Sequence, residues 1–276
     1  MNDRPFSRSE TAALATIAIC VVMLAVTSLS MAVDDRILRG VTVWSKPAKF
    51  ALSFGVHLAT LLIFVRLLGE LARSSWAAAI ALVSASVATL IEVLYVALQS
   101  ARGRESHFNT DTGFESFMYY QVMGGAALAM VAATGVVGVL VLRQASANVG
   151  AGLRLGAGWG AIISAVATLV VAGVLASGVL SGAGPWIGEP RTDAGGLPLV
   201  GWSRQTGDLR VPHFVATHLI QAMAVAGFLA DRLRLAPRLA VGAVAVARLA
   251  LVIATFVQAV TGFPLIPASS LAAAIP

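Results

Sequence analysis

Seven long apolar stretches constrain this chain more than any other feature of its sequence. A helix needs roughly 20 apolar residues to cross the hydrocarbon core of a bilayer. Only 12% of the residues are charged and 58% are hydrophobic, whereas a soluble domain is about 25% charged. The sequence therefore predicts an all-α polytopic transmembrane bundle, a single integral membrane domain over residues 1–276. Its spanning helices are expected near residues 11–33, 50–68, 76–99, 117–142, 158–181, 212–230 and 239–262, with a long loop over 182–211.

The distribution of charge predicts how the chain lies in the membrane. The net charge is +6, but no basic stripe alternates with exposed aromatic residues, so the lipid bilayer is the expected partner and nucleic acid is not. Arg4 and Arg8 precede the first helix, and the sixth and seventh helices are joined by a short arginine-rich loop. The positive-inside rule then predicts a cytoplasmic N-terminus, and the arginine-rich, alanine-rich composition favours a bacterial inner membrane. We name the N-terminal side of the membrane side A and the opposite side side B.

The first apolar stretch could also be a signal peptide, because Arg4 and Arg8 form a basic start. Its apolar run is longer than the 7–15 residues usual for a signal peptide. We therefore expect this stretch to remain in the protein as its first helix.

Polar residues gather on side B, where the connections after helices one, three and five are long and rich in charged groups. A rise of 1.5 Å per residue places His57, Glu92 and His218 each ~9–10 Å inside side B. Ionisable side chains at that depth are costly and normally face the bundle interior, where they pair with one another. These three residues therefore predict a polar site between helices two, three and six.

Other polar residues are expected around this site. His107 lies in the connection after helix three, and His213 lies five residues before His218, about 140° away around a regular helix. Arg248 in helix seven is expected to pair with Glu92. Residues that share a helix face or loop with the site are Ser53, Tyr95, Gln99, Asn109 and Gln221.

The only two lysines, Lys46 and Lys49, lie at the side-B entrance of helix two. They favour anchoring at the membrane interface, and the alternative is chemistry specific to lysine or contact with lipid headgroups.

Three segments carry a resemblance to known proteins: WSKPAKFALSFGVH, QSARGRESHFN and GDLRVPHFVATHLIQ. They resemble a family of uncharacterised bacterial multi-pass membrane proteins, which implies membrane insertion and no particular activity. A looser likeness is to the seven-helix hydrolases that include alkaline ceramidases and adiponectin-type receptors, which bind zinc through residues in a similar order. Here that order is Ser53 and His57, then Glu92, then His213 and His218, but the histidine pair is on helix six and its spacing is five.

Four functions remain open at this point. The first is a metal-dependent membrane enzyme that acts on a lipid or another amphiphile, with zinc or iron held by His57, His218, Glu92 and His213. Its candidate catalytic groups are Glu92, His107 and Lys46. The second is a b-type haem protein with His57 and His218 as axial ligands.

The third function is a proton-coupled transporter or a sensor that uses Glu92 as a proton relay. The fourth is an assembly or scaffold subunit, in which the polar cluster only specifies helix packing. The sequence determines neither the substrate nor the oligomeric state.

Overall fold

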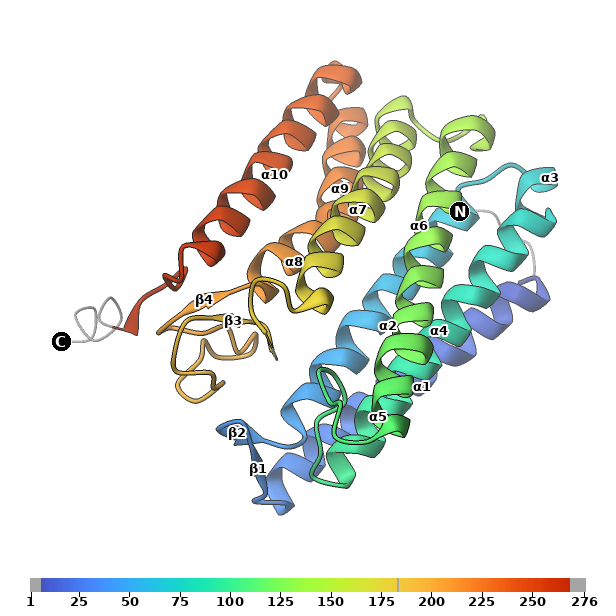
Figure 1. Cartoon of the computed structure of the whole chain (residues 1–276). Helices are drawn as coiled ribbons and strands as arrows, with labels where there is room; N and C mark the ends of the chain where they lie inside the picture. Colours follow the sequence, from blue (N-terminus) through green and yellow to red (C-terminus); the bar gives the residue numbers. More distant parts are fainter. Residues whose placement is uncertain (1–5, 183, 269–276) are drawn as a thin grey trace.

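The computed structural model describes residues 6–182 and 184–268. Within these ranges seven helical spans are long and apolar enough to cross a membrane, as expected for a multi-pass membrane protein. This confirms the all-α bundle (Figure 1). The spans are α1 (Arg8–Val33), α2 (Ser45–Arg66), α4 (Trp76–Ala101), the continuous α5 (Gly113–Phe117), η1 (Met118–Met123) and α6 (Gly124–Gln144), then α7 (Ala151–Ser177), the pair α8 (Arg210–Thr217) and α9 (Leu219–Arg232), and α10 (Pro237–Val260).

The short elements lie in the connections. On side A, α3 (Glu70–Arg73) separates α2 from α4. On side B, β1 (Ile37–Leu38) and β2 (Val41–Thr42) form one antiparallel pair, and β3 (Trp186–Ile187) and β4 (Gly207–Asp208) form another. The expected long loop is therefore partly ordered by β3 and β4.

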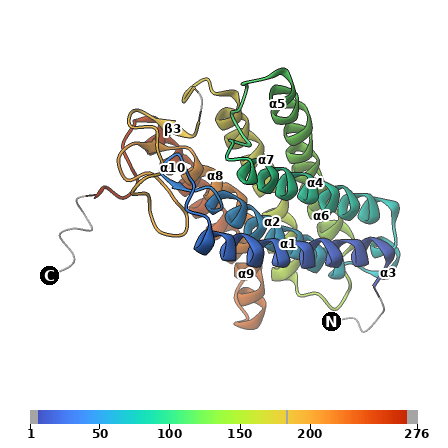
Figure 2. The same cartoon turned by 90° about the horizontal axis from the view of Figure 1, so that it is seen from below.

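The spans pack as two groups that meet at α6 and α7. One group holds α1, α2, α4 and α6, and the other holds α7, α8, α9 and α10, as Figures 1 and 2 show from two directions. Helices α7 and α9 approach so closely that a Cβ at Gly156 would collide with the carbonyl oxygen of Met223. Small residues at such crossings allow the close backbone packing that holds membrane helices together.

Several helices extend beyond the apolar stretches. Helix α2 begins at Ser45 and α7 at Ala151, whereas apolar character begins near residues 50 and 158. Hydropathy marks the part of a helix inside the hydrocarbon, and the hydrogen-bonded backbone continues into the polar interface.

The sixth span is broken at His218, which ends α8 and precedes α9 with φ −88° and ψ 2°. A break frees backbone carbonyl groups, and in a membrane these must find donors within the protein. Ser164 Oγ on α7 donates to the oxygens of Ala216 and Thr217, at 2.8 and 3.2 Å. Arg248 Nη2 on α10 donates to the oxygen of Val215 at 3.2 Å. The expected pairing of Arg248 with Glu92 is therefore wrong, because Arg248 caps the interrupted helix instead.

The side-A end of α1 is held by a buried ion pair. Glu10 is fully buried, and its two carboxylate oxygens accept hydrogen bonds from the guanidinium of Arg73 on α3 at 2.9 and 2.8 Å. Arg66 at the end of α2 lies 3.6 Å from the same carboxylate, and the backbone N–H of Ser7 donates to it at 2.7 Å. One carboxylate thus joins α1, α2 and α3.

We expect Glu10→Gln to lower the free energy of unfolding by about 3 kcal/mol, because breaking a buried ion pair by removal of one partner is strongly destabilising. Denaturant titration in mixed micelles measures this change. The control is Glu189→Gln, since Glu189 is 74% exposed in its pair with Arg191 and an exposed pair contributes about 0–1 kcal/mol. Equal losses in both variants would contradict this role of Glu10.

Candidate functional site

The connection between α4 and α5, residues 102–112, brings His107 to the buried carboxyl of Glu92. The distance from His107 Nε2 to Glu92 Oε2 is 3.8 Å. Glu92 is 3% exposed, and its Oε2 has no hydrogen-bond partner among the residues that the structure describes. At 3.8 Å the two groups are within reach of an electrostatic interaction but too far apart for a direct hydrogen bond.

Three polar residues predicted from the sequence hold this connection in place. Gln99 Nε2 and Asn109 Nδ2 both donate to the backbone oxygen of Glu105, at 3.3 and 2.9 Å. Gln99 Nε2 also donates to the hydroxyl of Tyr95 at 3.2 Å. The carboxylate of Glu105 pairs with Arg39 at 2.5 Å. Gln99 and Asn109 therefore support the backbone that carries His107, and Tyr95 in turn accepts a hydrogen bond from Gln99.

Two aromatic rings enclose the imidazole of His107. The ring of Phe50 on α2 lies 5.3 Å from it and the ring of Tyr119 lies 5.8 Å from it, both edge-on. Lys46, one turn before Phe50, places its Nζ 5.7 Å from the Phe50 ring centroid. Sequence analysis missed Phe50 and Tyr119, and their only signal was an aromatic residue near the side-B end of a helix.

Tyr119 lies in a π-helical turn, η1, that sequence analysis did not predict. Such wide turns are uncommon and occur frequently at functional sites. The hydroxyl of Tyr119 donates to the backbone oxygen of Ala176 on α7 at 3.3 Å, so this side chain connects the two helix groups beside His107.

Burial and nearby positive charge lower the pKa of His107 well below its ordinary value of 6.5. Burial is the larger cause, because the charged imidazolium is disfavoured in a medium of low dielectric constant. Lys46 and His213 are close enough to His107 to add electrostatic repulsion. The imidazole is therefore neutral at neutral pH, with Lys46 and His213 as charged or titratable neighbours from α2 and α8.

The remaining predicted histidines have other partners. His57 Nε2 lies 2.9 Å from Thr134 Oγ1 on α6, and that hydroxyl donates to the oxygen of Met130 at 2.8 Å, so it accepts from His57. His218 stacks on Phe214 at 4.0 Å, and its Nδ1 lies 3.0 Å from the Phe214 oxygen. Thr134 was not among the residues expected from the sequence.

The outer predicted residues divide between buried and exposed positions. The Nδ1 atom of His213 is buried without a hydrogen-bond partner in the described chain. Gln221 Nε2 donates to Thr60 Oγ1 at 3.1 Å and so joins α9 to α2. Ser53 is exposed, so the structure does not bring it to the site.

The candidate metal ligands do not converge. Across residues 6–182 and 184–268, no group of three or more His, Cys, Asp or Glu side chains is arranged to hold a metal ion. The physical reason is that the ligand atoms face separate neighbours: Glu92 faces His107, His57 faces Thr134, and His218 faces the backbone of α8. A zinc or iron site formed jointly by His57, His218, Glu92 and His213 has no support in this arrangement.

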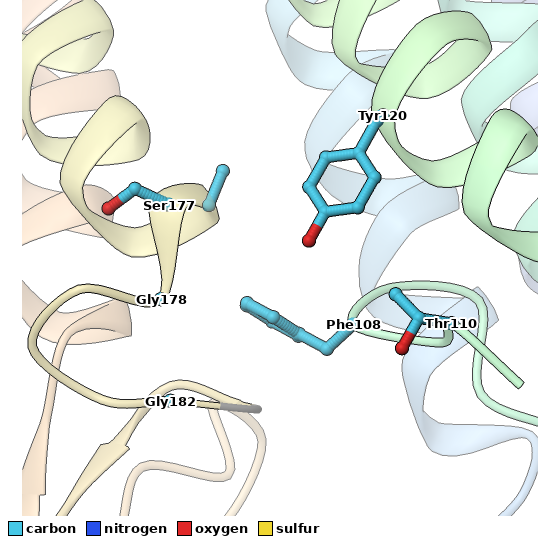
Figure 3. Close-up of a pocket in the computed structure, with 7 residues that line it drawn as sticks. Phe108, Thr110, Tyr120, Ser177, Gly178 and Gly182 are labelled. Atoms are coloured by element: carbon cyan, nitrogen blue, oxygen red, sulfur yellow. The ribbon is translucent and has the colours of Figure 1, made fainter.

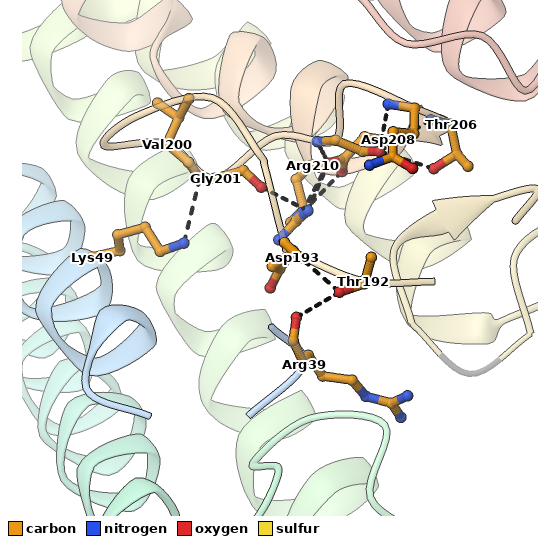
Figure 4. A network of polar contacts seen from close by, with 12 residues as sticks. Arg39, Lys49, Thr192, Asp193, Val200, Gly201, Thr206, Asp208 and Arg210 are labelled. Atoms are coloured by element: carbon orange, nitrogen blue, oxygen red, sulfur yellow. Dashed lines mark hydrogen bonds and ion pairs between the residues drawn. The ribbon is translucent and has the colours of Figure 1, made fainter. Parts of the chain in front are cut away.

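The loop between α7 and α8 forms a cap over side B, and Figure 4 shows the contacts that hold it. Arg210 pairs with Asp193 and Asp208, each at 2.7 Å, and donates to the oxygen of Gly201 at 3.0 Å. Lys49 Nζ donates to the oxygen of Val200 at 3.4 Å. Lys49 therefore anchors this cap to α2, whereas Lys46 lies beside the aromatic rings around His107.

A cavity of about 230 Å³ lies at the side-B surface between the end of α7 and η1. Figure 3 shows Phe108 and Tyr120 directed towards it, opposite Ser177. Phe108 has a positive φ of 58°, which is unusual for a bulky residue, and its ring lies 5.4 Å from that of Tyr119. Since Tyr119 also contacts His107, one aromatic ring lies between the cavity wall and the imidazole.

No family model matches the chain, and neither does a curated protein or a solved structure. The resemblances noted from the sequence therefore remain expectations, and the assignment of a function depends on the residues of this site.

The low pKa of His107 predicts loss of stability in mild acid. The unfolded chain binds a proton on this imidazole below about pH 6.5 while the folded chain does not, so stability is full above that pH and falls as the pH drops below it. We expect melting in detergent to show a smaller decrease between about pH 7 and 5 for His107→Gln than for the natural protein.

Thr110→Ala, a change in the same connection without a titratable group, serves as the control for this measurement. It should keep the natural pH dependence. Parallel melting profiles for His107→Gln and the natural protein would show that His107 does not contribute.

Proposed function

We propose that this chain is a proton-coupled membrane protein, a transporter or a sensor, with Glu92 and His107 as its proton-binding pair on side B. The observation that carries the proposal is the approach of His107 Nε2 to Glu92 Oε2 at 3.8 Å, with that oxygen buried and without a hydrogen-bond partner in the described part of the chain. Ionisable residues inside membrane spans commonly mark proton relays and ion pathways.

The pair can hold a proton in two ways. With the proton on Glu92 both groups are neutral, and with the proton on His107 they form an ion pair. Transfer between the two leaves the total charge unchanged, so it avoids the cost of creating an isolated charge in the hydrocarbon. A small side-chain rotation or one bridging water would bring the two atoms to proton-transfer distance. The positive charge of Lys46 opposes a second positive charge on His107 and so favours release of the proton.

The broken sixth span favours transport or sensing over a purely structural role. Interrupted spanning helices form the binding sites of many transporters. Here the break exposes carbonyl groups that Ser164 and Arg248 satisfy from two other helices. A scaffold would need neither this break nor a buried carboxyl oxygen without a partner, because both reduce stability.

A ligand of this system would bind in the side-B cavity. Its wall combines the aromatic rings of Phe108 and Tyr120 with Thr110, Ser177 and two glycines, and none of its lining residues is charged. That chemistry suits a small polar molecule without net charge. Tyr119 offers a physical connection, because its ring contacts both Phe108 and His107.

The remaining parts of the proposal concern location. We infer a bacterial inner membrane with the N-terminus in the cytoplasm, so that side B with its cap and cavity faces outwards. The resemblance to bacterial multi-pass membrane proteins agrees with this location.

Infrared difference spectroscopy on the purified protein tests the proton-binding pair. We expect a C=O stretching band of a protonated carboxylic acid that appears as the pH is lowered and shifts in deuterium oxide. Glu92→Gln should abolish this band, because it removes the only carboxyl group of the pair. Glu92→Asp should retain a band at an altered frequency.

The control is Glu115→Gln. Glu115 is also buried, but it is paired with Arg104 and Thr112 and lies outside the proposed pair. Its removal should leave the band in place. A band that persists in Glu92→Gln, or a natural protein without any pH-dependent carboxyl band, would refute the proton-binding role.

A further inference from the structure

A second cavity, of about 290 Å³, lies on side A between α7, α9 and α10. Leu155, Trp159 and Ile163 line it from one face of α7, since they are spaced by four residues. Arg238 and Gly242 line it from one face of α10, also four residues apart. The cavity is therefore a groove that runs along two neighbouring helices. Its lining residues are on other helices than Glu92 and His107.

The groove is charged at one end and apolar along the rest. Arg238 lies in the first turn of α10, at the membrane surface, and Ala245 lines the groove seven residues further on, ~10 Å deeper. Trp159 is 47% exposed beside it, and tryptophan favours the region of lipid headgroups. The groove thus has a cation at the membrane surface and apolar walls further in. A lipid has the matching arrangement, with its headgroup at the surface and its acyl chains inside.

The net charge at the surface end is positive, since these helix ends carry four arginines and one aspartate. The four arginines are exposed, and within the described ranges none of them forms an ion pair: Arg154, Arg232, Arg234 and Arg238. Asp231 is the one acidic residue in these helix ends, and its two oxygens accept the backbone N–H groups of Gly152 and Leu153, each at 2.7 Å. That carboxylate is therefore occupied by the start of α7, and the four arginines remain available to an anion.

The depth of the groove depends on Gly242. A Cβ at this position would meet no atom within 4 Å, so the space beside it is open. A larger side chain there would occupy the groove without colliding with the backbone of another helix.

We propose that this groove binds an anionic phospholipid. The phosphodiester lies at Arg238, with the neighbouring arginines adding positive charge, and an acyl chain lies along Gly242 and Ala245. Basic pockets between membrane helices favour anionic headgroups, and each arginine near the surface contributes to that attraction. The site is at the opposite membrane face from Glu92 and His107, so it is independent of the proton-coupled function.

Native mass spectrometry of the detergent-purified chain tests this proposal with phosphatidylglycerol and phosphatidylcholine of identical acyl chains. We expect the natural protein to retain phosphatidylglycerol and to lose phosphatidylcholine. Arg238→Gln should weaken phosphatidylglycerol binding roughly fivefold, because one arginine near a surface contributes about 1 kcal/mol. Gly242→Leu should abolish retention by filling the acyl-chain space, and Ala245→Leu should do the same from the next turn.

Two variants serve as matched controls. Arg143→Gln removes an exposed arginine at the side-A end of α6, outside the groove lining. Gly173→Leu adds the same side chain at another helical glycine with open space around it, in the side-B half of α7. Both should retain phosphatidylglycerol as the natural protein does, and melting profiles verify that every variant is folded.

Three results would overturn the proposal. Equal retention of the two lipids would show that charge plays no part. Equal weakening by Arg238→Gln and Arg143→Gln would indicate a diffuse attraction to the surface rather than a site. Competition by glycerol phosphate as strong as that by the lipid would assign the site to a soluble anion.

Discussion

The hydrocarbon core of a bilayer offers no hydrogen-bond partner, so every polar group inside it must be satisfied within the protein. This constraint explains the seven spans, and it also explains how their interruptions are tolerated. Where α8 ends at Thr217, Ser164 and Arg248 supply donors from two other helices. On side A the buried carboxylate of Glu10 is tolerated because the guanidinium of Arg73 pairs with it. Irregular backbone and buried charge thus depend on specific partners contributed by neighbouring helices.

Glu92 is one of the exceptions to this rule, as is Nδ1 of His213. The Oε2 atom of Glu92 is buried and has no hydrogen-bond partner among the described residues, and His107 Nε2 lies 3.8 Å from it. A buried polar atom without a partner is destabilising, so its presence points to a role other than packing. The supporting contacts strengthen that interpretation, because Gln99 and Asn109 fix the backbone that carries His107.

The two membrane faces are built differently. Side B has the cap, the aromatic rings around His107 and an uncharged cavity wall, whereas side A has short connections, exposed arginines and an apolar groove. Arg210 holds the cap through Asp193 and Asp208, and Lys49 ties the cap to α2. The proposed proton-binding pair and the proposed lipid groove therefore lie at opposite faces, and a change at one face need not disturb the other.

The sequence by itself determined the class of fold and the face on which the polar residues gather. Both follow from local physics, since a stretch of about 20 apolar residues must cross the membrane as a helix and the loop lengths are explicit in the chain. It also indicated that Glu92 needs a partner, because an ionisable group at that depth is costly. The sequence could not identify that partner. Helical depth alone grouped His57 and His218 with Glu92. In the structure, however, His57 is hydrogen-bonded to Thr134, and His218 lies against the backbone oxygen of Phe214 in α8.

Only the tertiary structure decided that His107, from a connecting loop, reaches Glu92. That outcome depends on how residues 102–112 fold back and on how each helix is rotated about its axis. The π-helical turn that presents Tyr119 and the break at His218 depend on the same long-range packing. Hydropathy and residue spacing report the environment along one helix at a time, whereas partner choice is set by contacts between segments distant in the chain.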